Sequence, residues 1–432
     1  MTVAAGGPLT INEPVLRWSA RAHSIAEVES KLARMWSRQD LGVEMDGQPG
    51  RHIAARTSVM NLVVVARRPE LAERGAATIQ ALTGRHPSRT IVVQSADPDG
   101  PSWIDARLEA HCVLPRENAP ETCAETIHLT VGGEAGRHLA AVVTPLIIHD
   151  LPVTVWWPGE PPFTSRTASD LLAGADRLVI DGSTWSGDGL ARLTEMAALV
   201  ESTRLAVSDF ALVRQSRWRE AIASIFDDPD FLPYLRSLRR VAVTYATHDE
   251  TDGLVSTNLV KPVYHVAWLI SRLGLTVLKP LTSVSASAAS TLRARQAARA
   301  RHVPGRGMAA TLSDGRGEVA VVIRPVVSAM PSGTTLRIEL LAERRGSELR
   351  ADVTAEAETV HVRVWQDGVE TLDRHFLAAR RGDVDLLAEA IEAGRRDGVA
   401  LGTLRAAASL VGAGSSPSGG AGQGGGGSQS GR

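Results

Sequence analysis

Residues 56–65 have the sequence Arg-Thr-Ser-Val-Met-Asn-Leu-Val-Val-Val, and Pro69 follows closely. A short, β-branched apolar run of this kind is typical of a strand buried on both faces, as in parallel sheets. Helical patterns alternate with such runs along the next hundred residues, which predicts an α/β domain. The other predicted elements of this domain are strands at about 90–94, 103–114, 125–131 and 152–157 and helices at about 24–38, 69–84 and 134–148.

The proline-rich segment 158–162 can continue neither a strand nor a helix, so we predict a linker there. The fold class predicted for the whole chain is α/β: two mixed α/β blocks, then a C-terminal antiparallel β-meander and helix. The predicted divisions are a mobile arm over 1–18, an N-terminal α/β domain over 19–160, a C-terminal domain over 164–410 and a disordered Gly/Ser-rich tail over 411–432. Within the C-terminal domain, we predict an α/β block over 164–280 and a meander plus helix over 307–410.

Composition excludes several classes of protein. The 432 residues carry 47 Lys and Arg against 48 Asp and Glu, and this balance argues against a general nucleic-acid binder. No apolar run reaches the roughly 18 residues that a membrane helix needs, and the first residues do not resemble a secretory signal. Two cysteines cannot form a disulfide framework, which suits a reducing compartment. We therefore expect a soluble cytoplasmic protein that binds neither nucleic acid nor membrane.

Nucleotide-binding motifs occur only in unsuitable places. The Gly-x-Gly-x-x-Gly pattern is found at Gly422, Gly424 and Gly427 inside the Gly/Ser-rich tail. A relaxed form at Gly315, Gly317 and Ala320 falls in a predicted hairpin. Neither context places a helix N-terminus against a pyrophosphate, and none of the three lysines follows the phosphate-loop pattern. We therefore expect no cofactor.

Motifs for metal binding and nucleophilic catalysis are also missing. The 12 histidines form no His-Glu-x-x-His, and the sequence holds neither a Cys-x-x-Cys nor a Gly-x-Ser-x-Gly elbow. For Cys112 and Cys123 we expect two structural thiols, with a redox pair as the alternative. His149 and Asp150 are expected to turn the chain. The sequence thus predicts no catalytic, cofactor-binding or metal-binding residue.

Two groups of residues are candidates for contact with a partner protein. Trp156 and Trp157 are adjacent on a predicted strand, so their side chains must point to opposite faces. We expect both faces to be covered, and one indole exposed for a partner is the alternative. Arg217, Trp218 and Arg219 open a predicted helix and are of the types enriched in binding hot spots, although packing within their own domain is the expected arrangement.

A third group is a candidate anion site. Gly133 and Gly136 lie between a predicted strand and helix, where backbone amides can hold an anion or form a plain tight turn. Of the two, we expect the turn. His86 and Arg89 would supply the side chains of the anion site, because arginine grips phosphate in a bidentate manner.

Several stretches, taken in order, resemble one known family. They are Arg56–Val64, His86–Arg89, Thr144–Pro152 with Trp156–Gly159, Ser216–Ile222, Ala267–Gly274 and Asp385–Glu389. This ordered set resembles the glucose-6-phosphate dehydrogenase assembly protein family, OpcA, from about residue 20 to residue 400.

The resemblance implies a non-catalytic partner of glucose-6-phosphate dehydrogenase, the NADP-dependent first enzyme of the oxidative pentose phosphate pathway. Members of the family promote the active oligomeric form of that enzyme or raise its affinity for substrate. The alternative hypothesis is a sugar-phosphate or nucleotide-binding sensor or enzyme that uses the candidate anion site.

Overall fold

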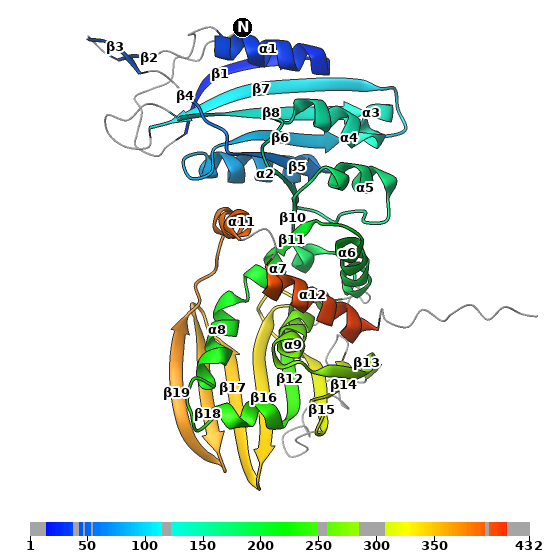
Figure 1. The fold of residues 1–432 in the computed structure, drawn as a ribbon, viewed down its shortest axis with the longest axis vertical. Coiled ribbons are helices and arrows are strands. Elements are labelled where there is room, and N and C mark those ends of the chain that lie inside the picture. The colour runs from blue at the N-terminus through cyan, green and yellow to red at the C-terminus, as the bar shows by residue number, and fades with distance from the viewer. Residues whose placement is uncertain are drawn as a thin grey trace, which may run out of the picture.

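The computed structural model describes residues 14–37, 43–45, 48–52, 55–114, 122–248, 257–284, 307–393 and 397–412. Most of the predicted arm, the predicted tail and the glycine pattern at Gly422, Gly424 and Gly427 lie outside these residues. Figure 1 shows two large sheets, one above the other along the long axis of the molecule. The α/β fold class predicted from the sequence is confirmed.

The first sheet is mainly parallel. Its strands are β1 (Val15–Ala22), β4 (Ala55–Arg56), β5 (Met60–Ala66), β6 (Ser88–Ser95), β7 (Trp103–Val113), β8 (Thr122–Gly132), β9 (Val153–Trp157), β10 (Arg177–Ile180) and β11 (Ala206–Asp209). Their order is β1-β7-β8-β6-β5-β9-β10-β11, with β4 beside β8. From β8 to β11 all neighbours are parallel. Numbered along the chain, these six strands follow the order 3-2-1-4-5-6 of doubly wound dinucleotide-binding sheets.

Strand β5 lies near the middle of this sheet, as its apolar run predicts. Leu62, Val63, Val64 and Val65 are each at most 2% exposed, because helices cover both faces. One face packs against α1 (Ile25–Ser37), α4 (Leu139–Val143), α5 (Arg166–Ala173) and α6 (Leu190–Ser202). The other face packs against α2 (Pro69–Leu82), α7 (Phe210–Val213) and α11 (Asp383–Glu392).

The second sheet is mainly antiparallel. Its strands are β12 (Leu238–Thr247), β13 (Thr276–Val284), β14 (Gly307–Ser313), β15 (Glu318–Val327), β16 (Thr335–Arg344), β17 (Ser347–Ala355), β18 (Thr359–Gln366) and β19 (Val369–Leu377). Their order is β13-β14-β15-β12-β16-β17-β18-β19, and only β12 and β15 are parallel. In Figure 1, α8 (Ser216–Ile225), α9 (Val260–Leu273) and α12 (Gly398–Val411) lie over this sheet. Gly315 and Gly317 fall in the β14–β15 hairpin, as predicted.

The sheets divide the chain differently from the predicted α/β block over 164–280. β10 and β11 extend the first sheet beyond the predicted linker at 158–162, whereas β12 and β13 join the second sheet. Strand periodicity does not reveal which sheet a strand enters. Residues 15–18, predicted as part of a mobile arm, belong to β1 and pair with β7, where Trp18 is buried.

Two predicted helices also differ. The helix expected over 134–148 is broken into α3 (Gly133–Arg137), α4 and a 3-10 turn at Thr144–Leu146. The break falls at His138, whose backbone is not helical, and Pro145 lies in the 3-10 turn. After the meander, where one helix was predicted, the chain forms two, α11 and α12. Among the described helices, none combines the length and apolar character needed to cross a membrane.

Cys112 and Cys123 are not separate thiols. They face each other across the antiparallel strands β7 and β8 and form a disulfide. Both residues are fully buried. The expectation of two structural thiols was therefore wrong, because the hairpin register brings together residues that are 11 positions apart.

Candidate functional site

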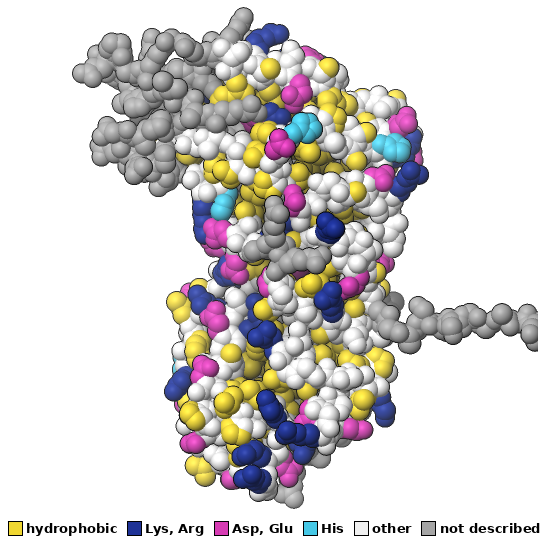
Figure 2. Space-filling view, viewed as in Figure 1, with side chains coloured by type: hydrophobic (Ala, Val, Ile, Leu, Met, Phe, Trp, Pro, Cys, Tyr) yellow, Lys and Arg dark blue, Asp and Glu magenta, His cyan; other side chains and the backbone are white. Residues whose placement is uncertain are grey.

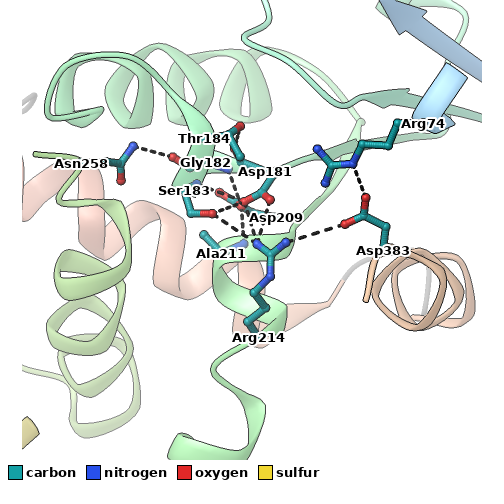
Figure 3. A network of polar contacts seen from close by, with 10 residues as sticks. All are labelled: Arg74, Asp181, Gly182, Ser183, Thr184, Asp209, Ala211, Arg214, Asn258 and Asp383. Carbon is teal, nitrogen blue, oxygen red and sulfur yellow. Dashed lines mark hydrogen bonds and ion pairs between the residues drawn. The ribbon is translucent and has the colours of Figure 1, made fainter. Parts of the chain in front are cut away.

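The carboxyl ends of β10 and β11 carry a network of acidic and basic side chains, shown in Figure 3. Asp181 directly follows β10, and Asp209 is the last residue of β11. In open parallel sheets, ligands bind at this edge, so these strand ends are the first place to look for a functional site.

Asp209 is fully enclosed by the protein. Its Oδ1 accepts hydrogen bonds from the backbone N–H groups of Gly182 (2.9 Å) and Ala211 (2.8 Å), and Tyr264 donates its hydroxyl to Oδ2 at 2.8 Å. Burial, together with the charge of Asp181, raises the pKa of Asp209 to about 7, and the three hydrogen bonds only partly oppose this. A Cβ at position 182 would lie 2.6 Å from Oδ2 of Asp209, so glycine is needed there.

A chain of ion pairs begins at the neighbouring Asp181 and leads outward. Nη1 of Arg214 lies 2.9 and 2.8 Å from the two carboxylate oxygens of Asp181. Its Nη2 lies 3.9 Å from Asp383 of α11, and Asp383 also pairs with Arg74 of α2. The network thus joins α2 of the first sheet to α7 and α11 (Figure 3).

Helix α9, which lies over the second sheet, contributes further residues to the network. Its Tyr264 bonds Asp209, and burial lowers the pKa of its Lys261. Burial also lowers the pKa of His265 to about 3, with the charges of Arg219 and Lys261 acting in the same direction. His265 is therefore neutral at pH 7, and its ring contacts that of Trp218 at a centroid distance of 5.3 Å.

This arrangement holds the two halves together and leaves almost no room for a substrate. The cavity beside Asp209 and Tyr264 has a volume of about 30 Å³, enough for about one water molecule. The carboxylate and guanidinium groups of the network are engaged by one another or by backbone amides. The network is therefore a buried junction in which one carboxyl, that of Asp209, has a pKa of about 7.

The turn at which a dinucleotide would bind in such a sheet also lacks the features needed to hold one. In doubly wound sheets, a glycine-rich turn after the first strand lets the backbone approach the pyrophosphate. The corresponding β5–α2 turn contains Arg67, Arg68 and Pro69 and no glycine. The space beside Gly159, which follows β9, is occupied by Leu71 of α2. A Cβ at position 159 would lie 3.0 Å from the Leu71 side chain.

A larger groove of about 410 Å³ lies between α2 and the uncovered face of β7 and β8. Glu109 lies within it and contacts His128 (3.2 Å) and Arg107 (3.1 Å). The hydrogen bond from His128 lowers the pKa of Glu109, whereas burial lowers the pKa of His111 nearby. Arg107 and His128 are therefore already paired with a carboxylate that lines the same groove.

The predicted partner-binding tryptophans lie in the interior. Trp156 is 1% exposed and packs with Phe210 and α11, and Trp157 is 3% exposed and packs on the opposite face. The structure therefore has both faces covered, the arrangement that the sequence favoured. Neither indole is available at the surface, so a role in partner contact is not carried further for these two.

The α8 candidates are placed differently from one another. Arg217 is exposed and pairs with Glu220 at 2.6 Å on the outer side of the helix. Trp218 is half-buried against His265, and Arg219 donates to the backbone carbonyl of Leu212 at 2.7 Å. Of the three, Arg217 is the side chain that a partner could reach most directly.

The candidate anion residues do not meet. Arg89 begins β6, whereas Gly133 follows the end of β8, and these strands are parallel. Since Arg89 pairs with Glu125 in register, Gly133 lies about eight residues further along, or roughly 26 Å at the rise of a strand. His86 bonds Glu392 at 3.0 Å instead. Gly133 has a φ of 58°, as in a tight turn, and a Cβ at Gly136 would lie 2.8 Å from Ser95.

Instead, three of the recognisable motifs meet at the amino edge of the parallel strands. Asn61 donates to the carbonyls of Ile148 and Leu151 and accepts from the Ile148 N–H, so it fixes the turn that contains His149 and Asp150. Arg89 binds the buried carboxylate of Glu125 and the carbonyl of Leu146. Trp36 also donates to Glu125, at 2.6 Å. These motif residues hold the fold together.

The residues of the junction were missed from the sequence. An aspartate at a strand end, such as Asp181 after Leu178–Ile180, is a signal that could have pointed to this edge. Nothing in the sequence links Tyr264 to Asp209, which lies 55 positions earlier.

Comparison with known proteins agrees with the resemblance. A family model described as the glucose-6-phosphate dehydrogenase subunit N-terminal domain matches residues 79–198, and one described as its C-terminal domain matches residues 205–399. Two proteins named "Putative OxPP cycle protein OpcA" are similar. The one from Synechocystis sp. is 25% identical over 46% of this chain and 40% of its own length, and the one from Synechococcus elongatus is 23% identical over 46% and 43%. The alignments thus span less than half the length of these relatives.

Among solved structures, an oxidoreductase from Sinorhizobium meliloti has a TM-score of 0.46 at 11% identity, covering 82% of this chain and 95% of that one. A likeness of this size says nothing about activity. The two family matches together span most of the chain and meet near the last strands of the first sheet. The chain therefore belongs to the OpcA family, whose domains are described as those of a glucose-6-phosphate dehydrogenase subunit.

Proposed function

We propose that this protein binds glucose-6-phosphate dehydrogenase in the cytoplasm and promotes its active oligomeric state, without catalysing a reaction itself. The observation that carries the proposal is the pair of family matches over 79–198 and 205–399. The names of the relatives, which refer to the oxidative pentose phosphate cycle, support the same role.

The geometry of the carboxyl edge supports a non-catalytic role. At the carboxyl edge of the parallel strands, the β5–α2 turn lacks glycine, and Asp181 and Asp209 are engaged by Arg214 and Tyr264. The sensor or enzyme hypothesis needs Arg89 free for an anion, but Arg89 is 6% exposed at its side chain and pairs with Glu125. We therefore favour action through a protein surface.

An activator of this kind must bind the competent state of the dehydrogenase more tightly than the other state. A tenfold shift in the population of the two states needs about 1.4 kcal/mol of differential binding. Such a difference is small compared with the energy of a protein interface, so a few contacts suffice. Basic and acidic side chains are scattered over the face in Figure 2, and a group of Lys and Arg lies at its lower end.

Mixing the purified protein with its cognate dehydrogenase is expected to produce a species heavier than either component. Sedimentation velocity at micromolar concentrations measures this directly. The matched control replaces the dehydrogenase with an unrelated oligomeric dehydrogenase of similar mass. Independent sedimentation of the two proteins across the concentration range would contradict the proposal.

Replacing Arg217 with alanine is expected to weaken binding of the dehydrogenase at least tenfold, because α8 presents this residue outward. The folding cost should be small, since the Arg217–Glu220 pair is 57% and 56% exposed at its side chains. Arg166→Ala on α5 is the matched control, an exposed helical arginine paired with Asp170 four residues later. Equal binding by both variants would show that α8 is not part of the contact.

A further inference from the structure

Two histidines and two carboxylates gather on the uncovered face of the second sheet, at its β19 edge. His361 of β18 and His375 of β19 are directly opposite each other in register. Their rings are stacked, with centroids 4.0 Å apart. Glu356 follows β17 in the tight connection to β18, and Asp373 lies two residues before His375 on the same face.

The distances in this cluster are those of metal ligands. Oε1 of Glu356 lies 3.4 Å from Nδ1 of His361, and Oε2 lies 3.5 Å from Nε2 of His375. The three ligand atoms lie within 4.8 Å of one another. A tetrahedral zinc ion with bonds of about 2.0–2.1 Å places its ligand atoms about 3.4 Å apart. Little movement is needed for all three groups to reach one ion.

The surrounding residues orient the ligands. The other ring nitrogen of His361, Nε2, bonds Oδ1 of Asp373 at 2.9 Å. Metal-binding histidines usually have such a carboxylate partner, which directs the free nitrogen to the ion. Thr359 donates its hydroxyl to Oε2 of Glu356 at 2.6 Å, which holds that carboxylate in place beside the two rings.

The stacking of the two rings brings one nitrogen of each imidazole to the same carboxylate. Nδ1 of His361 and Nε2 of His375 both lie within 3.5 Å of an oxygen of Glu356. Neutral imidazole is the form that binds a metal. Two His and one carboxylate are a ligand set known for zinc, with the remaining position open to water or to another ligand.

We propose that Glu356, His361 and His375 form a binding site for zinc or a closely related divalent transition metal, with Asp373 as a positioning residue. The side chains of Glu356 and His375 are 42% and 51% exposed, so an ion can enter from solvent. The sequence predicted no metal site, because these ligands follow no short motif and only the strand register joins them.

The test is titration of the full chain with Zn²⁺ by calorimetry and with Co²⁺ by visible absorption. We expect one ion per chain for the unaltered protein, with cobalt bands typical of low-coordinate nitrogen and oxygen ligands. His361→Ala and His375→Ala should each abolish this binding. Asp373→Asn should keep the stoichiometry and weaken the affinity about 10–100-fold, because it only orients His361.

The matched control is His23→Ala, an exposed histidine 3.6 Å from the carboxylate of Asp105. This variant should bind the ion as the unaltered protein does. Circular dichroism checks that each variant is folded. Absence of binding to the unaltered chain, or full binding by the double variant of His361 and His375, would overturn the proposal.

Discussion

Arg89→Ala is expected to lower the free energy of unfolding by about 3–5 kcal/mol, because it removes the cation of a buried ion pair. The carboxylate of Glu125 is 0% exposed, and both Arg89 and Trp36 donate to it. Arg89 also donates to the carbonyl of Leu146, so its loss frees the chain before the 148–151 turn. Urea denaturation followed by circular dichroism measures the change.

Two further variants separate the buried charge from the loss of side-chain volume. The double variant Arg89→Met with Glu125→Leu should recover much of the stability, since an apolar pair of similar size leaves no unpaired charge. Arg405→Ala removes an exposed partner of Glu201 and should cost no more than about 1 kcal/mol. An Arg89→Ala protein as stable as Arg405→Ala would show that the motif residues do not hold the amino edge together.

Asp209→Asn is expected to stabilise the protein above pH 7 and to have little effect near pH 4. The folded-state pKa of Asp209 is about 7, above that of an unfolded aspartate, so the folded state keeps a proton that the unfolded state has lost. Its contribution is fully present below about pH 4 and disappears as the pH rises through 7, at up to about 1.4 kcal/mol for each pH unit. Asparagine cannot ionise, and its oxygen can still accept from Gly182 and Ala211.

The measurement is the difference in unfolding free energy between this variant and the unaltered protein at several values between pH 4 and pH 8. Other carboxyls titrate in both proteins and cancel in the difference. Tyr264→Phe is a useful companion, because it removes one hydrogen bond to Asp209 and should move the transition to higher pH. A difference that does not change with pH would show that Asp209 does not titrate in this range.

Local patterns predicted the elements better than they predicted the sheets. The valine run of β5 and the helices α1, α2 and α8 follow from apolar periodicity, which is a property of neighbouring residues. The start of α1 is also a local feature, because the backbone N–H of Glu27 donates to the hydroxyl of Ser24, three residues earlier, at 3.2 Å. Sheet membership depends on pairing between distant strands, so the assignment of β10 and β11 to the first sheet did not follow from the sequence.

The candidate site shows the same contrast between local patterns, which could be predicted, and contacts between distant residues, which could not. Adjacent tryptophans on a strand must face opposite ways, and this rule predicted the covered faces around Trp156 and Trp157. Arg89 was predicted to grip an anion, and it does bind one, but the anion is the internal carboxylate of Glu125. Its sequence separation of 36 residues and the parallel register of β6 and β8 lay beyond any local pattern. The pairing of His361 with His375 likewise depends on the register of two strands and on no local pattern.

We propose that this protein acts on a partner enzyme and has no reaction of its own. Steady-state kinetics of the cognate glucose-6-phosphate dehydrogenase, titrated with the purified protein, test this proposal most directly. We expect a saturable fall in the apparent KM for glucose 6-phosphate or a rise in kcat, with no NADPH formed by this protein alone. Unchanged kinetics at saturating concentrations, or turnover by the isolated protein, would contradict it.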